Sequence, residues 1–215
     1  MAMLKVKQFV FNAFGENTYV ISDSETREAA VIDPGMMAES ERREFDNYIS
    51  ASQLKIVEVI NTHLHLDHCF GDNYVRDRYG VKVAANIGDA PLGADLTGQL
   101  RRFGGRGDAD AVSIDVQLKE GDVIKIGSGE LQVIETPGHS PGGICLYCPQ
   151  GGFLISGDTL FRGGVGRTDL YGGNARQLSE SIRKKLFTLP DETKVLPGHD
   201  RFTTIGDEKR SNPYV

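Results

Sequence analysis

The placement of five histidines is the feature that most constrains this chain of 215 residues. Three of them lie within the segment T-H-L-H-L-D-H at 62–68. The other two end near-identical segments, T-P-G-H at 136–139 and L-P-G-H at 196–199. With the histidine and aspartate content of this chain, H-x-H-x-D-H arises by chance in roughly one such chain in several thousand. We therefore interpret the histidines as one functional set.

Each histidine segment follows a pattern that is typical of a buried strand. Apolar and β-branched residues at 56–60, 131–135 and 194–196 predict strands that end just before His63, His139 and His199, and a strand at 153–155 ends before Asp158. Strand ends meet at one edge of open α/β folds, where ligands bind. The pattern predicts that these residues meet on one rim. In both Pro-Gly turns we expect glycine at positive φ.

The remaining patterns predict a single domain over residues 1–215. We expect further strands at 5–11, 18–21, 29–32, 81–85, 123–126 and 143–148, and helices at 39–52, 71–79 and from Asn174 through Leu178, Ile182 and Leu186. Residues 86–112 contain six glycines and are expected to be irregular. This order predicts a layered α/β sandwich with helices outside packed sheets.

Composition excludes several classes of protein. The chain has 24 Lys and Arg against 30 Asp and Glu, and its net charge of −6 opposes nucleic-acid binding. No run approaches 18 apolar residues, and the N-terminus lacks the apolar core of a secretory signal, so we expect no membrane partner. Three cysteines give no disulfide framework, which favours a cytoplasmic location.

Imidazole and carboxylate side chains make up the candidate metal ligands. The set is His63, His65, Asp67, His68, His139, Asp158 and His199. Neutral imidazole with carboxylate suits Zn²⁺, Fe or Mn better than Ca²⁺ or Mg²⁺. Seven ligands exceed the four of a tetrahedral zinc site and suit two divalent metal ions that share a bridging carboxylate and a bridging hydroxide.

The motifs T-H-L-H-L-D-H, T-P-G-H-S, S-G-D-T-L-F and L-P-G-H-D resemble, in order, those of the metallo-β-lactamase superfamily. The resemblance runs from Asn17 to the C-terminus. It implies an αβ/βα four-layer sandwich with a dinuclear metal site on the rim of the two sheets. His63, His65 and His139 would hold the first metal, Asp67, His68 and His199 the second, and Asp158 would bridge them.

Within this superfamily, G-R-T-D at 166–169 and R-S-N-P-Y at 210–214 resemble the short glyoxalase II-like (hydroxyacylglutathione hydrolase-like) enzymes. The resemblance implies hydrolysis of a small anionic thioester, such as a glutathione thioester, by a metal-bridging hydroxide that Asp67 would orient. Long-form glyoxalase II adds a C-terminal helical segment that helps to bind glutathione. This sequence reaches Val215 without that segment, so we expect fewer contacts to the thiol carrier.

A thioester also fits the residues themselves. If every histidine is a metal ligand, none is left to protonate a leaving group. A thiolate leaves without a proton because a thiol has a pKa of about 8.5, whereas an amide nitrogen must be protonated. Two other functions stay open. An iron persulfide dioxygenase of the same superfamily would use His63, His139 and Asp158 on one Fe(II), and a non-catalytic scaffold would bind metal without turnover.

Several residues carry weaker signals. Arg167 either binds a substrate carboxylate or pairs with a neighbour such as Asp169. The basic residues Arg101, Arg102 and Arg106 are interpreted as a solvated charge run, with a lid that attracts an anionic thiol carrier as the alternative. Cys145 and Cys148 are expected on opposite faces of a strand, and Cys69 is expected to be simply buried.

Overall fold

The first half of the chain builds one six-stranded sheet. The computed structural model describes residues 4–215 and orders the strands β1-β2-β3-β4-β5-β6. They are β1 (Leu4–Phe11), β2 (Glu16–Asp23), β3 (Glu28–Ile32), β4 (Lys55–Ile60), β5 (Val83–Ala85) and β6 (Val116–Gln117). The pairs from β1 to β3 are antiparallel, and those from β3 to β6 are parallel. Because parallel strands run in one direction, β3, β4 and β5 end at the same edge.

The second half builds a sheet of the same size in the order β14-β13-β10-β9-β8-β7. Its strands are β7 (Val123–Ile126), β8 (Gly129–Glu135), β9 (Ile144–Cys148), β10 (Phe153–Gly157), β13 (Lys194–Pro197) and β14 (Thr203–Thr204). β10 is parallel to β13, and β9 is antiparallel to both β8 and β10. β8, β10 and β13 therefore also end at one edge. Between β10 and β13 in sequence, β11 (Leu160–Phe161) and β12 (Gly164–Val165) form a separate hairpin.

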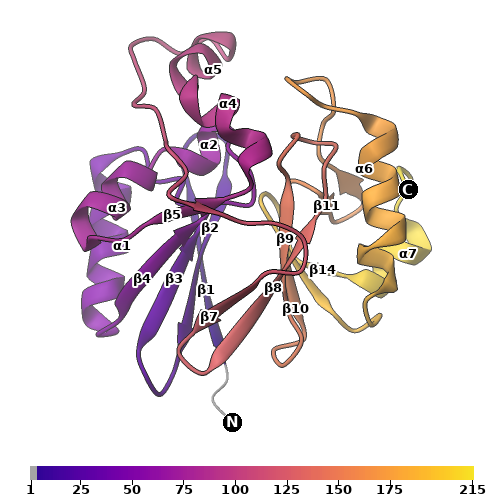
Figure 1. Cartoon of the computed structure of the whole chain (residues 1–215), viewed down its shortest axis with the longest axis horizontal. Helices are drawn as coiled ribbons and strands as arrows, with labels where there is room; N and C mark the ends of the chain where they lie inside the picture. The colour runs from indigo at the N-terminus through magenta and orange to yellow at the C-terminus, as the bar shows by residue number, and fades with distance from the viewer. Residues whose placement is uncertain (1–3) are drawn as a thin grey trace.

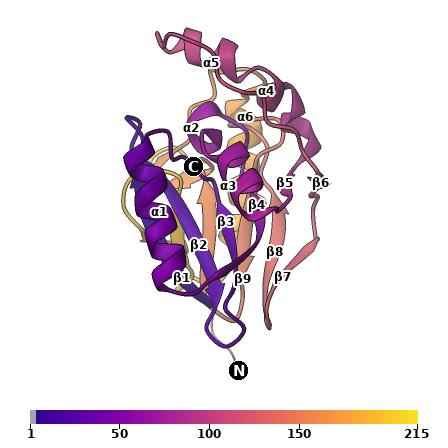
Figure 2. The same cartoon turned by 90° about the vertical axis from the view of Figure 1, so that its left-hand side faces the viewer.

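Helices cover the outer face of each sheet, which gives four layers (Figures 1 and 2). The helices are α1 (Glu39–Ala51), α2 (Leu66–Cys69), α3 (Asp72–Tyr79), α4 (Ala90–Ala94), α5 (Leu96–Arg102), α6 (Ala175–Lys184) and α7 (Ile205–Ser211), with short 3-10 turns η1 (Ile87–Asp89) and η2 (Leu186–Thr188). α1 and α3 lie beside the first sheet, and α6 and α7 lie beside the second (Figure 1). α4 and α5 extend beyond the upper edge, on the side of the first sheet.

Three apolar clusters hold these layers together. The middle cluster joins the two sheets, with Tyr19 and Ile60 from the first and Leu131 and Ile155 from the second. A second cluster packs α1 and α3 on the first sheet, and a third packs α6 on the second. Since every core strand is covered on both faces, the sheets form a rigid frame whose strand ends point to one rim.

The structure confirms the predicted αβ/βα sandwich. Helix 39–52 appears as α1, and helix 71–79 as α3, which ends at Gly80 in the left-handed conformation. Asn174 caps α6 by accepting a hydrogen bond from the backbone of Gln177. That helix ends at Lys184, however, so Leu186 lies in η2 and not in the helix.

The prediction that residues 86–112 are irregular is wrong for their first part, which forms η1, α4 and α5. These helices are too short to show a repeating apolar pattern. Their stability comes from local caps and burial: Asn86 and Asp95 accept hydrogen bonds from backbone N–H groups, while Leu92 and Leu96 pack into the first core cluster. The short elements α2, α7, β11, β12 and β14 were also not predicted.

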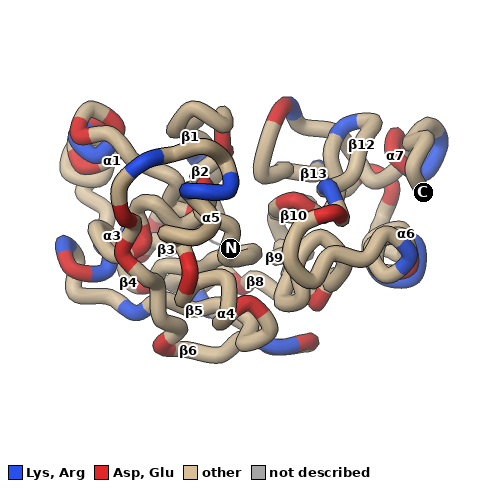
Figure 3. The backbone as a smooth tube through the Cα atoms, turned by 90° about the horizontal axis from the view of Figure 1, so that it is seen from above, with Lys and Arg blue, Asp and Glu red and all other residues tan. Residues whose placement is uncertain are grey.

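Within residues 4–215, no helix combines the length and the apolar character that a membrane crossing requires. Lys, Arg, Asp and Glu are interspersed over both halves of the molecule when it is viewed from above (Figure 3).

Gly138→Ala should destabilise the fold. Gly138 has φ 137°, and an added Cβ would collide with the backbone of Leu178 at the start of α6. We expect the free energy of unfolding to fall by roughly 2–6 kcal/mol, from backbone strain plus overpacking. Gly163→Ala is the matched control because φ is 66° there and no atom lies within 4 Å of the added Cβ. Urea denaturation measures both; equal losses for the two variants would contradict the packing argument.

Candidate metal centre

The first sheet supplies four candidate ligands from one short segment after β4. His63 and His65 lie in the loop that follows β4, and Asp67 and His68 lie on the single turn of α2. The three imidazoles of this segment are at least 95% buried. The i, i+2 spacing of His63 and His65 belongs to an extended chain, whereas Asp67 and His68 are separated from them by the start of the helix. One segment therefore supplies candidate ligands to two neighbouring metal positions.

The second sheet supplies the other three ligands, one from each strand that ends at the shared edge. His139 follows β8, Asp158 follows β10 and His199 follows β13. β10 and β13 are adjacent, which holds Asp158 and His199 side by side. The sequence prediction that strand ends gather these residues is confirmed.

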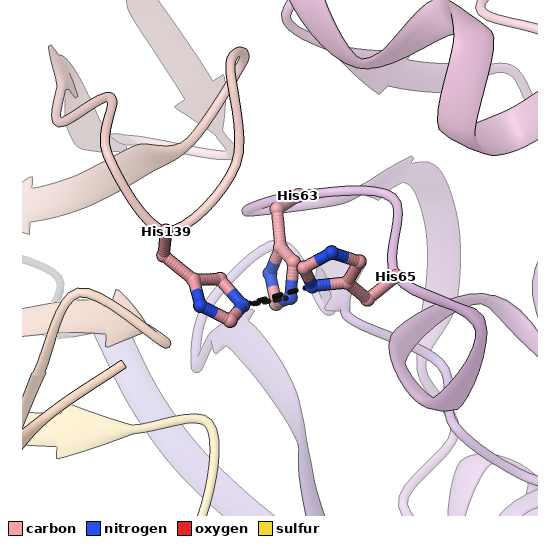
Figure 4. Close-up of side chains that lie close together, drawn as sticks. All are labelled: His63, His65 and His139. Atoms are coloured by element: carbon pink, nitrogen blue, oxygen red, sulfur yellow. Dashed lines mark hydrogen bonds between the residues drawn. The ribbon is translucent and has the colours of Figure 1, made fainter. Parts of the chain in front are cut away.

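His63, His65 and His139 form the first group, with one nitrogen from each ring close to the others (Figure 4). His65 Nδ1 lies 2.8 Å from His139 Nε2, and His139 Nε2 lies 3.3 Å from His63 Nε2. Asp158 Oδ2 is 3.5 Å from the same His139 nitrogen. This carboxylate therefore borders the first group.

Asp67, His68 and His199 form the second group. His199 Nε2 lies 3.3 Å from both Asp67 Oδ2 and His68 Nε2. The other oxygen of Asp158, Oδ1, is 3.4 Å from His68 Nε2. Asp158 Oδ2 also lies 3.6 Å from His199 Nε2, so the carboxylate borders both groups, as a bridging carboxylate would.

Four of the five imidazoles are oriented by a hydrogen bond from their outward nitrogen. Nδ1 of His68 donates to Asp33, that of His139 to the Arg167 carbonyl and that of His199 to the Phe14 carbonyl. His63 Nδ1 donates to the hydroxyl of Thr62, which in turn donates to Asp33. Each bond leaves a lone pair on Nε2, directed into the site, and such outer partners are typical of metal-binding histidines.

Asp33 is a functional residue that the sequence reasoning missed. It lies at the end of β3 and accepts hydrogen bonds from the backbone and the hydroxyl of Thr62, both at 2.7 Å. It also accepts from His68, so one carboxylate fixes ligands of both groups. Asp33 opens the segment D-P-G at 33–35. It shows the same pattern, a buried strand followed by a polar residue, that identified Asp158.

Residues of β2 hold the last ligand turn in place across the gap between the sheets. The side chain of Asn17 donates to the carbonyls of Pro197 and Asp200, and the Tyr19 hydroxyl donates to Pro197. Gly198 does not have the positive φ that was expected. Its role is close approach, because a Cβ there would collide with Asp158 and lie 2.7 Å from His68 Cε1.

Burial and mutual charge set the protonation of the site. Burial lowers the pKa of His65 to about 3, and burial with the nearby His68 holds the pKa of His63 well below its usual value. Burial alone would raise the pKa of Asp158, but His68 and His139 lower it far below the usual range. The first group therefore favours neutral imidazole beside an ionised Asp158, the forms that bind metal. In the second group burial lowers the pKa of His68 and His199, but Asp67 and Asp158 outweigh it and raise both above the usual value, so a metal ion there would displace protons.

The donor set fits two metal ions. Nitrogen lone pairs that meet at 2.8–3.3 Å repel one another unless a cation or a proton lies between them. Asp158 Oδ1 is buried and has no hydrogen-bond partner among the described residues. An ionised, buried oxygen without a partner is costly, and a metal cation would satisfy it.

The weaker sequence signals have clear places in the structure. Arg167 forms a bidentate pair with Asp169, with both N–O distances 2.7 Å, as the alternative interpretation proposed. Its carbonyl, not its guanidinium, contacts the site. Cys145 and Cys148 face different core clusters, as predicted, and Cys69 is buried in the first cluster.

Sequence comparison gives the family. The model of the metallo-beta-lactamase superfamily matches residues 12–199, a range that contains all seven candidate ligands. The chain belongs to the metallo-beta-lactamase superfamily. Among curated members, it is similar to the hydroxyacylglutathione hydrolase GloC of Haemophilus influenzae, with 37% identity over 205 residues and 94% of each chain covered.

Solved structures of this superfamily superpose closely on the chain. BLEG-1, a B3 metallo-beta-lactamase, has a TM-score of 0.88 and 34% identity, covering 98% of this chain and 99% of the other. ETHE1 from Myxococcus xanthus has a TM-score of 0.79 and 33% identity, covering 97% and 83%. The chain is thus a metallo-hydrolase superfamily member with a His/Asp metal-binding group.

Asp158→Ala should lower metal content at both positions, because Asp158 presents an oxygen to each group. His199→Ala should mainly reduce occupancy of the second position. The fold should persist in both variants, since a core of this size does not depend on metal. Metal analysis together with circular dichroism measures this. Full metal content in a folded Asp158→Ala protein would exclude the bridging role.

Proposed function

We propose that the protein is a metal-dependent hydrolase of glutathione-type thioesters. The observation that carries this proposal is the use of all five histidines. Each directs one ring nitrogen into the site, and four hold the other in a hydrogen bond. No imidazole is left as a general acid. The reaction that fits is one whose leaving group departs without a proton, as a thiolate does.

Each of the two groups would hold one metal ion. His63, His65 and His139 would hold one divalent ion, Asp67, His68 and His199 the other, and Asp158 both. When bound, such ions supply a hydroxide nucleophile near neutral pH and positive charge that stabilises the developing oxyanion. We expect Zn²⁺, with Fe and Mn as the alternatives.

Asp67 has a second role in this proposal. Its carboxylate Oδ2 lies beside both imidazoles of its group, 3.3 Å from His199 Nε2 and 3.8 Å from His68 Nε2. Burial alone would raise the pKa of Asp67, but His68 and the hydrogen bond from His199 lower it. An ionised carboxylate here can accept a hydrogen bond from the attacking hydroxide and so fix its direction.

Iron-dependent persulfide dioxygenase activity is the second candidate. It is motivated by the face formed by His63, His139 and Asp158, in which the His139 Nε2 atom lies 3.3 Å from His63 Nε2 and 3.5 Å from Asp158 Oδ2. Two histidines and one carboxylate with open positions are typical of non-haem Fe(II) oxygenases. The second group, with its own complete set of ligands, favours the hydrolase.

Two assays on one preparation separate these functions. Thiol release from S-lactoylglutathione reports hydrolysis, and oxygen uptake with glutathione persulfide reports dioxygenation. We expect thiol release with a kcat in the usual range of about 1–10³ s⁻¹ and no oxygen uptake above background. A cephalosporin, whose leaving nitrogen needs a proton, should be hydrolysed far more slowly. Metal-stripped protein is the control.

Iron-dependent oxygen uptake without thiol release would replace the hydrolase by the dioxygenase. If fully metallated protein shows neither thiol release nor oxygen uptake, thioesters are excluded as the substrate class. A non-catalytic scaffold role would then be the better explanation.

A further inference from the structure

The segment that contains α4 and α5 is fixed directly to the candidate metal centre. Gln99 on α5 is 93% buried, and its side-chain oxygen accepts a hydrogen bond from the backbone N–H of Leu66. Its nitrogen donates to the carbonyls of Leu64 and Leu92. Leu64 and Leu66 flank His65. The last turn of α5 is therefore held at a defined position beside a ligand, and is not a loose surface loop.

The end of α5 meets a second loop that is also tied to ligands. Phe103, which follows α5, packs edge-on against Phe14, with 5.7 Å between the ring centroids. The Phe14 carbonyl accepts from His199, and Asn12 in the same loop donates to the Asp67 carbonyl. Both rings stay about two-fifths exposed. An apolar surface thus borders the site on the side of the first sheet.

Arg102 lies next to this apolar surface, and its guanidinium has no partner among the described residues. A small pocket of about 10 Å³ beside the metal centre is lined by His65, Gln99, Arg102, Phe103 and Tyr171, so it marks where these side chains meet and does not itself enclose a substrate. Arg102 has no ion pair or side-chain hydrogen bond among the described residues, whereas Arg101 pairs with Asp108 and Arg167 with Asp169. Of the arginines that sequence analysis selected, Arg102 alone combines a free charge with a position in a pocket shared with a ligand.

We propose that Arg102, beside the exposed rings of Phe103 and Tyr171, binds a carboxylate on the thiol half of the substrate. A thioester bound at the metal centre would place its acyl group over His63, His65 and His139 and extend its thiol carrier over the exposed side chains of Arg102, Phe103 and Tyr171. A guanidinium with free N–H groups suits a carboxylate, and the rings suit a peptide-like chain. This inference rests on the proposed function, because it names the part of that substrate that is recognised.

Arg102→Ala is compared with Arg106→Ala, which removes an equally free charge from the same segment outside the pocket. Two substrates are used: S-lactoylglutathione, and S-lactoyl-N-acetylcysteamine, which has the thioester but no carboxylate. We expect Arg102→Ala to raise KM for the glutathione thioester about 10- to 100-fold with little change in kcat. KM for the neutral thioester should not change, and Arg106→Ala should alter neither.

A binding measurement tests the carboxylate subsite independently of the proposed hydrolase activity. S-methylglutathione is a thioether that cannot be hydrolysed, and its Kd by calorimetry should weaken at least tenfold in Arg102→Ala only. If the wild-type protein releases no thiol from either thioester but shows this loss, the proposed function fails and the carboxylate subsite stands. Equal effects of the two variants, equal effects on the two substrates, or no binding of the thioether by the wild-type protein would overturn the subsite.

Discussion

The structure depends on the meeting of two sets of strand ends at one rim. β3, β4 and β5 end there from the first sheet, and β8, β10 and β13 end there from the second. The apolar cluster between the sheets fixes their separation, so the ligands that follow these strands need little further adjustment. Ring nitrogens 2.8–3.3 Å apart could not be maintained by flexible loops, because the lone pairs oppose the arrangement.

Outer hydrogen bonds convert this meeting of strands into a defined site. Asp33 joins the Thr62–His63 turn to His68, and Asn17 and Tyr19 reach from the first sheet to the turn before His199. These bonds cross between elements far apart in sequence. With the Arg167 and Phe14 carbonyls, the bonds to Asp33 and Thr62 orient four of the five imidazoles so that a lone pair faces inward, which is why burial of so many polar groups is tolerated here.

The sequence was sufficient to predict the fold and the gathering of the candidate ligands, because these residues follow buried strands, directly or, for Asp67 and His68, on the short helix that comes next. It was not sufficient for the residues that support them. Gln99 and Asn17 are neutral amides without a characteristic spacing, and their function arises only when α5 packs on the metal-binding segment and β2 faces β13. For Gly198 the sequence predicts the turn correctly but not the reason for the glycine. That reason is the close approach of His68 and Asp158, which are 130 and 40 residues away in sequence. The short α4 and α5 show too few turns for a periodic pattern.

The central claim is that one chain holds two metal ions bridged by Asp158. The most direct measurement is anomalous diffraction from crystals of metal-replete protein, collected at the Zn, Fe and Mn absorption edges. The account predicts two peaks in each chain, one beside His63, His65 and His139 and the other beside Asp67, His68 and His199, with Asp158 contacting both. A single peak, with Asp67 and His199 turned away from it, would contradict the account.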